Sequence, residues 1–253
     1  MQIVGYEPAG ADPAVLLLAA DRAVTREPLV PGSEIDYGLG DRHCAGALDG
    51  DSHDPCDAPA APRCAIHADD WPCARCRGDC TRPRQTCREP HDVYLAAFPP
   101  AVFKVGVTRA GRLERRLREQ GAARGTRIRR VEDGRRARRI EARLADRPDL
   151  TDRVRVQTKI DGLASAVDEA AWRALLDGFD HDDVLRFDRD LALDARPVAA
   201  TMAAGRVCGS VGRVAVLDRG ATSYAVDLRD LVGYEVRPGA ADPARQTSLG
   251  AFD

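Results

Sequence analysis

Short apolar runs, separated by proline and glycine, occupy both ends of the chain. Runs with this punctuation predict β-strands rather than helices. The predicted terminal strands are 3–6, 14–19, 34–39, 206–211, 213–217 and 222–228. The sequence Val-Gly-Tyr-Glu stands at residues 4–7 and again at 232–235. This repeat is compatible with the two ends supplying equivalent strands of one small sheet or barrel.

The middle of the chain alternates between strand and helix patterns. The runs at 93–98 and 102–107 flank Pro99-Pro100 and predict two strands of a hairpin. Apolar residues at helical spacing then mark the faces of amphipathic helices. Further predicted elements are a strand at 127–131 and helices at 112–123, 133–146 and 165–179.

Charge is strongly segregated, although the formal net charge is only −2. Residues 1–70 hold 13 acidic against 4 basic residues, whereas residues 109–143 hold 14 arginines against 5 acidic residues. Codon bias explains why only two of the 38 basic residues are lysine, but it does not explain the cluster. The cluster predicts an anionic partner, DNA or RNA first. The candidate nucleic-acid contacts are Arg109, Arg112, Arg115 and Arg118.

Cysteine and histidine are concentrated in one segment that is poor in apolar residues. Two-residue gaps recur there, and such a gap lets one tight turn direct two ligands at the same metal ion. A bound metal would supply the order that a segment without an apolar core lacks. The candidate ligands are Cys44, His53, Cys56, Cys64, His67, Cys73, Cys76, Cys80 and Cys87. We expect one or two structural Zn²⁺ ions, and the spacing leaves open which ligands share an ion.

These patterns together predict an α+β fold, in which a small antiparallel sheet is flanked by helices and carries a zinc-binding insert and β-rich terminal segments. The expected segments are an N-terminal β segment (1–41), a Cys/His-rich segment (42–90), an α/β core with trailing helices (91–195) and a C-terminal β segment (196–253).

No membrane or export segment is expected. The longest apolar run, 14–20, is far shorter than a bilayer span. Residues 1–5 lack the basic start and apolar stretch of a signal peptide. We therefore expect a cytoplasmic protein, and the sequence singles out no protein partner.

Three residues of the middle region have the chemistry of phosphodiester hydrolysis. That reaction needs a group that activates water, positive charge on the developing oxyanion, and usually a divalent metal held by a carboxylate. Tyr94 in the first hairpin strand, Arg116 in the first helix and Glu141 in the second helix supply these groups in order.

At these positions the chain resembles the GIY-YIG nuclease superfamily. In that family a hairpin carries two signature tripeptides, and the following helices carry an arginine and a metal-binding glutamate. Val93-Tyr94-Leu95 and Lys104-Val105-Gly106 stand where the tripeptides would be. Val93 replaces the expected glycine, and Lys104 replaces the second tyrosine.

The helical arginine of the resemblance has three candidates in this chain. Arg116 looks like the family's arginine, with Arg112 and Arg115 as rivals, and Glu141 looks like its metal-binding glutamate. Over the whole chain, the cysteine pairs and residues 91–96, 104–109 and 119–122 resemble an uncharacterised domain-of-unknown-function family. That family pairs a cysteine-rich segment with a GIY-YIG-like core and a β tail. The resemblance implies the architecture rather than a reaction.

Two functions follow from these residues. The first is a Mg²⁺-dependent nuclease on DNA or RNA, in which Tyr94 aids deprotonation of water, Arg116 steadies the phosphorane, Glu141 binds Mg²⁺ and Lys104 completes the catalytic set. The second is a non-catalytic, zinc-stabilised nucleic-acid-binding protein with a degenerate nuclease-like core. Retention of Tyr94, Arg116 and Glu141 favours the first function, and Lys104 at the second tyrosine position favours the second.

Overall fold

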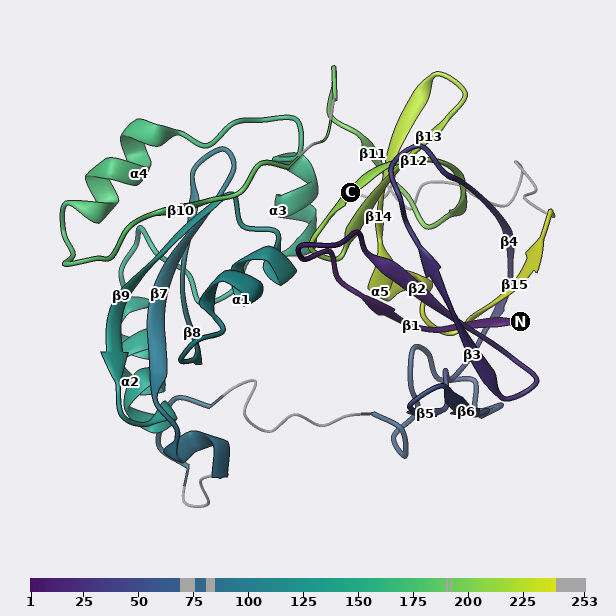
Figure 1. Cartoon of the computed structure of the whole chain (residues 1–253), viewed down its shortest axis with the longest axis horizontal. Coiled ribbons are helices and arrows are strands. Elements are labelled where there is room, and N and C mark those ends of the chain that lie inside the picture. Colours follow the sequence, from purple (N-terminus) through teal and green to yellow (C-terminus); the bar gives the residue numbers. More distant parts are fainter. Residues whose placement is uncertain (69–75, 81–84, 190, 192, 240–253) are drawn as a thin grey trace. The chain divides into compact units, whose positions relative to one another are not determined.

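The computed structural model describes residues 1–68, 76–80, 85–189, 191 and 193–239 (Figure 1). The chain divides into two compact units. Unit 1 comprises residues 1–70 and 190–253, and unit 2 comprises residues 71–189. The Cys/His-rich segment expected at 42–90 is therefore divided between the two units at residue 70.

Unit 1 contains one sheet of eleven strands, in the order β11-β14-β13-β12-β4-β15-β1-β2-β3-β6-β5. The strands are β1 (Gln2–Glu7), β2 (Val15–Ala20), β3 (Ala23–Pro28), β4 (Glu34–Arg42), β5 (Ala47–Asp49), β6 (Ser52–Asp54), β11 (Val198–Ala199), β12 (Ala203–Val211), β13 (Val214–Arg219), β14 (Thr222–Asp227) and β15 (Tyr234–Pro238). A single helical turn, α5 (Leu228–Leu231), joins β14 to β15. The predicted terminal strands are present, and β3, which the sequence pattern missed, pairs with β2.

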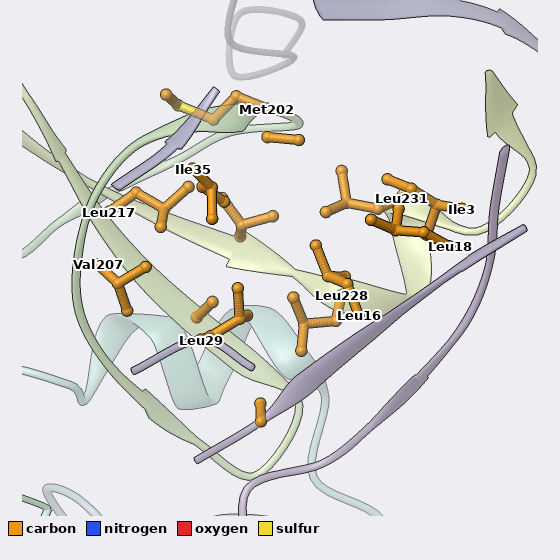
Figure 2. Close-up of a cluster of buried hydrophobic side chains, with 14 of the residues drawn as sticks. Ile3, Leu16, Leu18, Leu29, Ile35, Met202, Val207, Leu217, Leu228 and Leu231 are labelled. Atoms are coloured by element: carbon orange, nitrogen blue, oxygen red, sulfur yellow. The ribbon is translucent and has the colours of Figure 1, made fainter. Parts of the chain in front are cut away.

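The eleven-stranded sheet curves around one apolar core. Leu16 of β2 and Leu217 of β13 stand in strands five places apart in the sheet order, yet they belong to the same buried cluster. Figure 2 shows this cluster enclosed by strands from both ends of the sequence, with Leu228 and Leu231 of α5 among its members. The core is therefore built jointly by the N-terminal and C-terminal segments.

The first copy of Val-Gly-Tyr-Glu lies in β1, and the second leads into the neighbouring strand β15. β1 pairs with β15 in antiparallel register, with Gln2 opposite Glu235. The amide of Gly233 donates to the carbonyl of Ile3 at 2.8 Å. The expectation that the two ends supply strands of one sheet is confirmed.

Unit 2 contains a four-stranded antiparallel sheet in the order β10-β9-β7-β8. Its strands are β7 (His91–Phe98), β8 (Val102–Arg109), β9 (Arg124–Val131) and β10 (Leu185–Arg186). Its helices are α1 (Leu113–Gln120), α2 (Gly134–Leu144), α3 (Val156–Asp161), α4 (Glu169–Leu176) and the 3₁₀ turn η2 (Gln85–Arg88). The predicted hairpin of residues 93–107 is confirmed by the β7–β8 pairing, in which Tyr94 lies opposite Gly106.

Strand β7 is buried along nearly all of its length because both faces of the sheet are covered. Its residues 93, 95 and 97 pack with Ala137 of α2 and Trp172 of α4. Residues 94, 96 and 98 pack with Leu117 of α1. The apolar run of this strand is thus explained by one layer of helices on each side.

Local capping sets where two of these helices begin. Asp133 caps α2 by accepting a hydrogen bond from the amide of Arg136 at 2.8 Å. Asp168 caps α4 by accepting from the amides of Ala170 and Ala171. The sequence pattern placed the start of this last helix at Ser165, three residues too early, because Asp168 is the capping residue itself.

The expected fold class, α+β with a small antiparallel sheet flanked by helices, is wrong for this chain. The described residues form fifteen strands and five α-helices, and the longest of these helices, α2, has 11 residues. The chain is therefore mostly β. The segments expected as terminal appendages build the larger sheet, because β4 pairs with β12 and β15 from the far end of the chain. Within the described part of the chain, no helix has the length and apolar character needed to cross a bilayer.

Candidate functional site

A short hairpin in unit 1 brings two predicted metal ligands together. Cys44 precedes β5 and Cys56 follows β6, and these strands pair in antiparallel register with Leu48 opposite His53. The hairpin therefore brings Cys56 back to the end at which Cys44 lies. Cys64 and His67 follow in a turn in which the amide of His67 donates to the carbonyl of Cys64 at 3.0 Å.

The four side chains form one compact group. The ligand atoms of Cys44, Cys56, Cys64 and His67 all lie within 4.8 Å of one another. Nδ1 of His67 lies 3.4 Å from Sγ of Cys44 and 3.3 Å from Sγ of Cys64. The backbone amides of His67 and Ile66 lower the pKa of the Cys64 thiol to about 6. Low thiol pKa values favour the thiolate, which is the metal-binding form.

This donor set fits a tetrahedral zinc ion. Zn–S bonds of 2.3 Å and Zn–N bonds near 2.0–2.1 Å imply S···N separations of about 3.6 Å around one ion. The measured separations at His67 are close to that value. Three cysteines and one histidine are also a common ligand set of closed structural zinc sites. This group, which we call the Cys₃His site, could therefore hold a metal ion such as zinc.

The remaining predicted ligands that the structure describes lie outside the Cys₃His site. His53 is buried on β6, where its Nε2 lies 3.0 Å from the carbonyl of Ala45. Cys76, Cys80 and Cys87 belong to unit 2. Cys73 lies outside the described residues.

In unit 2, four predicted catalytic residues come together from four different elements. Tyr94 is on β7, Lys104 on β8, Arg116 on α1 and Glu141 on α2. The charges of Arg116 and Glu141 act on both the Tyr94 hydroxyl and the Lys104 ammonium. We call these four residues, with Gln120, the Tyr94 cluster.

The Tyr94 hydroxyl is buried and held in one place. It accepts a hydrogen bond from Nε2 of Gln120 at 2.6 Å. A Cβ atom at position 106 would collide with the hydroxyl, so the residue opposite Tyr94 has to be glycine. Burial raises the pKa of Tyr94, and the group therefore stays a neutral phenol at ordinary pH.

Lys104 is a buried cation beside the glutamate. Its Nζ donates to the backbone carbonyl of Asp152, and the neighbouring backbone joins Thr151 to β8. Burial lowers the pKa of Lys104 to about 8, although the charge of Glu141 acts in the opposite direction. Lys104 thus places a group that loses its proton near pH 8 within reach of the charge of Glu141.

One carboxylate oxygen of Glu141 is engaged, and within the described part of the chain the other, Oε1, has no hydrogen bond or ion pair. Its side chain is about 10% exposed, and Nη1 of Arg138 donates to its Oε2 at 2.8 Å. Carboxylate oxygens are the ligands that Mg²⁺ takes from proteins, commonly one or two together with phosphate oxygens. The donor chemistry of Glu141 therefore fits a divalent ion through Oε1.

Sequence reasoning missed Gln120 and Arg138. Gln120 stands four residues after Arg116, and Arg138 stands three residues before Glu141. Residues at these spacings share one face of a helix. Helical spacing around Arg116 and Glu141 was therefore the signal that could have identified both.

The predicted nucleic-acid contacts are partly neutralised within the chain. Arg109 pairs with Glu89 at 3.4 Å, Arg115 with Glu119 at 2.8 Å and Arg118 with Glu114 at 2.9 Å. Arg112 is exposed at the start of α1. Helix α2 is the more basic helix, since it carries five arginines and one glutamate.

Replacing Lys104 by methionine is expected to stabilise the protein near pH 7. The folded state then no longer keeps a buried ammonium among Glu141, Arg116, Asp152 and Arg138. A pKa of about 8, against 10.5 for an ordinary lysine, corresponds to roughly 3 kcal/mol, and the lost hydrogen bonds reduce the net gain to about 1–2 kcal/mol. Urea denaturation of wild type and variant measures the difference.

The pH dependence of that difference identifies its cause. The folded lysine loses its proton near pH 8, whereas the unfolded lysine keeps it to about pH 10.5, so wild type gains stability between these values. The gain in the free energy of unfolding that Lys104→Met gives over wild type should therefore be complete below pH 8 and shrink towards pH 10.5. A variant that is less stable than wild type at pH 7 would contradict this account.

A family profile described as a protein of unknown function (DUF2797) matches residues 54–197. No curated protein and no solved structure matches the chain. Because the match covers more than half of the sequence, the chain belongs to the DUF2797 family of proteins of unknown function.

Proposed function

We propose that this protein acts on nucleic acid through unit 2, as a metal-dependent phosphodiesterase. The observation that carries the proposal is the Tyr94 cluster. Its members come from β7, β8, α1 and α2, yet Tyr94 and Lys104 interact with the same Arg116 and Glu141. A neutral hydroxyl, two cations and a carboxylate are the groups that phosphodiester hydrolysis requires.

Each residue has a separate task in this proposal. The Tyr94 hydroxyl, oriented by Gln120, hydrogen-bonds the attacking water, and Arg116 stabilises the negative charge that grows on the phosphoryl oxygens. Glu141 would hold Mg²⁺ through Oε1, and the bound ion would polarise the phosphoryl oxygen and favour attack by water. Water attacks phosphorus and gives up a proton to the surrounding solvent. The bond from phosphorus to the leaving oxygen breaks, its electron pair stays on that oxygen, and the resulting alkoxide takes a proton from the solvent.

A second candidate function is nucleic-acid binding without hydrolysis. The ion pair between Arg138 and Glu141 at 2.8 Å favours it, because a carboxylate already neutralised binds a metal less strongly. Lys104 also favours it, since its ammonium is suited to holding a phosphate oxygen.

Binding to nucleic acid is expected to weaken steeply with salt. Phosphate contacts release counterions, so four contacts lower affinity by about 100-fold between 50 and 200 mM salt. Arg112→Gln should reduce the magnitude of the slope of log affinity against log salt by about 1, because Arg112 is exposed one helical turn before Arg116. Fluorescence anisotropy with labelled single- and double-stranded oligonucleotides measures this slope.

Arg173→Gln is the matched control. Arg173 is also an exposed arginine, but it lies on α4, outside the basic 109–143 segment. Its slope should equal that of wild type. Affinity that stays flat over this salt range, or an Arg173→Gln effect as large as that of Arg112→Gln, would contradict binding by the basic segment. Incubation of the same oligonucleotides with Mg²⁺ then distinguishes cleavage from binding alone.

A further inference from the structure

The Cys₃His site lies next to strands that the two ends of the chain form. Its first ligand, Cys44, stands two residues after the end of β4, and β4 pairs with β15. The amide of His43 donates to the carbonyl of Gly233, just before β15, at 3.0 Å. Gly233 has φ +98°, and a Cβ atom there would collide with the carbonyl of His43, so this close approach requires glycine. The backbone that enters β15 therefore packs directly against the residue before the first ligand.

The side chain of Gln2 joins the same two backbone segments from β1. Gln2 is 7% exposed, and its Nε2 lies 3.3 Å from the carbonyl of Cys44, 3.1 Å from that of Gly233 and 3.2 Å from Nδ1 of His43. An amide nitrogen carries two hydrogens, so it can donate to both carbonyls. A buried carbonyl that loses its donor destabilises the fold. Gln2 therefore favours the state in which Cys44 and the start of β15 are both in place.

His43 connects a second ligand to β15. Its Nδ1 lies 3.0 Å from the carbonyl of Cys56, and because a carbonyl only accepts, Nδ1 is the donor. The other ring nitrogen, Nε2, lies 3.4 Å from Oε1 of Glu235 in β15. Partners just outside a metal site orient its ligands, and their loss typically lowers metal affinity about 10–100-fold. His43 thus links the backbone of a metal ligand to β15.

β15 is the strand that joins the two halves of the large sheet. In the sheet order it stands between β4 and β1, with β12, β13, β14 and β11 beyond β4, and β2, β3, β6 and β5 beyond β1. β4 is paired with β15 along most of its length, whereas the register with β1 gives the single pair of Gln2 with Glu235. The backbone pairing of β15 with β1 is therefore short, and the side chain of Gln2 lies at this junction.

We propose that the Cys₃His site is a metal-operated latch that holds β15 in the sheet, with Gln2 and His43 as the positioning residues that connect the two. The proposal rests on metal binding by the four ligands. A bound ion fixes the backbone of Cys44 and Cys56. Their carbonyls accept from Gln2 and His43, and these two side chains also contact the segment that forms β15. Metal binding and docking of β15 then favour each other, as linkage requires, and loss of the ion releases β15 from β1.

Amide hydrogen exchange of the full-length, zinc-loaded protein, with and without a zinc chelator, tests the latch. The amides of Gly233 and Val236 donate to the carbonyls of Ile3 and Met1 at 2.8 Å and report on the junction of β1 with β15. After chelation they should exchange about 5–150-fold faster, the usual range of coupling between two sites. The amides between β13 and β14 should keep their protection. Amides of β15 that stay protected after the zinc has been removed would overturn the proposal.

The zinc affinity of variants tests the coupling from the other direction. His43→Ala leaves all four ligands in place but should lower zinc affinity about 10–100-fold, measured by competition with a chromophoric chelator. Glu235→Ala should also lower it, because Glu235 acts through His43. Arg237→Ala is the matched control, since Arg237 is likewise an exposed charged residue of β15, and its affinity should equal that of wild type. Equal affinities of His43→Ala and Arg237→Ala would overturn the latch. Wild type that binds no zinc would refute the metal site itself, and the latch with it.

Discussion

His67→Ala protein is expected to lose the metal ion of the Cys₃His site and the order of the surrounding segment. Residues 44–68 contain two three-residue strands and few buried apolar side chains, so we expect their folding to depend on a metal ion bound at the Cys₃His site. Apparent binding energies of structural zinc are roughly 10–16 kcal/mol. Mutating residues that only contact the metal ligands changes metal affinity about 10–100-fold. Loss of a ligand itself should therefore lower metal affinity by more than about 100-fold. Elemental analysis and limited proteolysis measure both effects.

His53→Ala is the matched control for that prediction. His53 is a buried histidine in the same segment, but its Nε2 lies against the carbonyl of Ala45 rather than in the cluster. The variant should keep its zinc and lose only a small part of its stability. If His67→Ala retained its zinc, or if His53→Ala lost as much as His67→Ala, the assignment of ligands would be wrong.

The sequence spacing was informative about metal chemistry but not about ligand grouping. The pair His53-x2-Cys56 matched the expected gap, yet β6 turns His53 towards Ala45. Cys44 has no partner at such a gap and nevertheless joins the site, because the β5–β6 hairpin returns the chain to it. Successive side chains of a strand point to opposite faces of the sheet. A two-residue spacing that begins in a strand therefore does not by itself place two ligands together.

Local patterns were sufficient for the core of unit 2. The β7–β8 hairpin, α1 and α2 lie within a few residues of their predicted positions, because each follows from apolar spacing in a short window. That hairpin and those two helices position Tyr94, Lys104, Arg116 and Glu141, which explains why a motif order in the sequence became a cluster in space.

The large sheet could not be predicted in the same way. Its pairs of β4 with β12 and of β1 with β15 join residues about 170 to 230 positions apart in the sequence, and local periodicity carries no information about such partners. The sequence also predicted only in part which arginines of the basic segment are neutralised by ion pairs. Glu114 and Glu119 stand four residues from Arg118 and Arg115, a spacing at which ion pairs form on a helix, but Arg116 also stands at pairing distance from Glu119.

Glu141→Gln is expected to abolish Mg²⁺-dependent cleavage while leaving nucleic-acid binding intact. Glutamine keeps the shape of the side chain and can still accept from Arg138, but it lacks the charge that holds a divalent ion. Cleavage should fall by at least about 100-fold. Affinity should stay equal or increase slightly, since the variant has one negative charge fewer. Cleavage rates under saturating oligonucleotide, together with anisotropy titrations, separate the two effects.

Glu132→Gln is the matched control for Glu141→Gln. It removes the same negative charge, but Glu132 is exposed in the turn before α2. Its cleavage rate should equal that of wild type.

Tyr94→Phe should slow cleavage as well, since it keeps the packed ring and removes the hydroxyl that Gln120 orients. Both variants have to be compared at equal zinc content, because unfolding would lower binding and cleavage together. Cleavage that survives Glu141→Gln at the wild-type rate would refute the catalytic role of this cluster. Wild type that binds but cleaves no single- or double-stranded substrate would instead support the binding function. The Arg138–Glu141 ion pair would then explain why cleavage is missing.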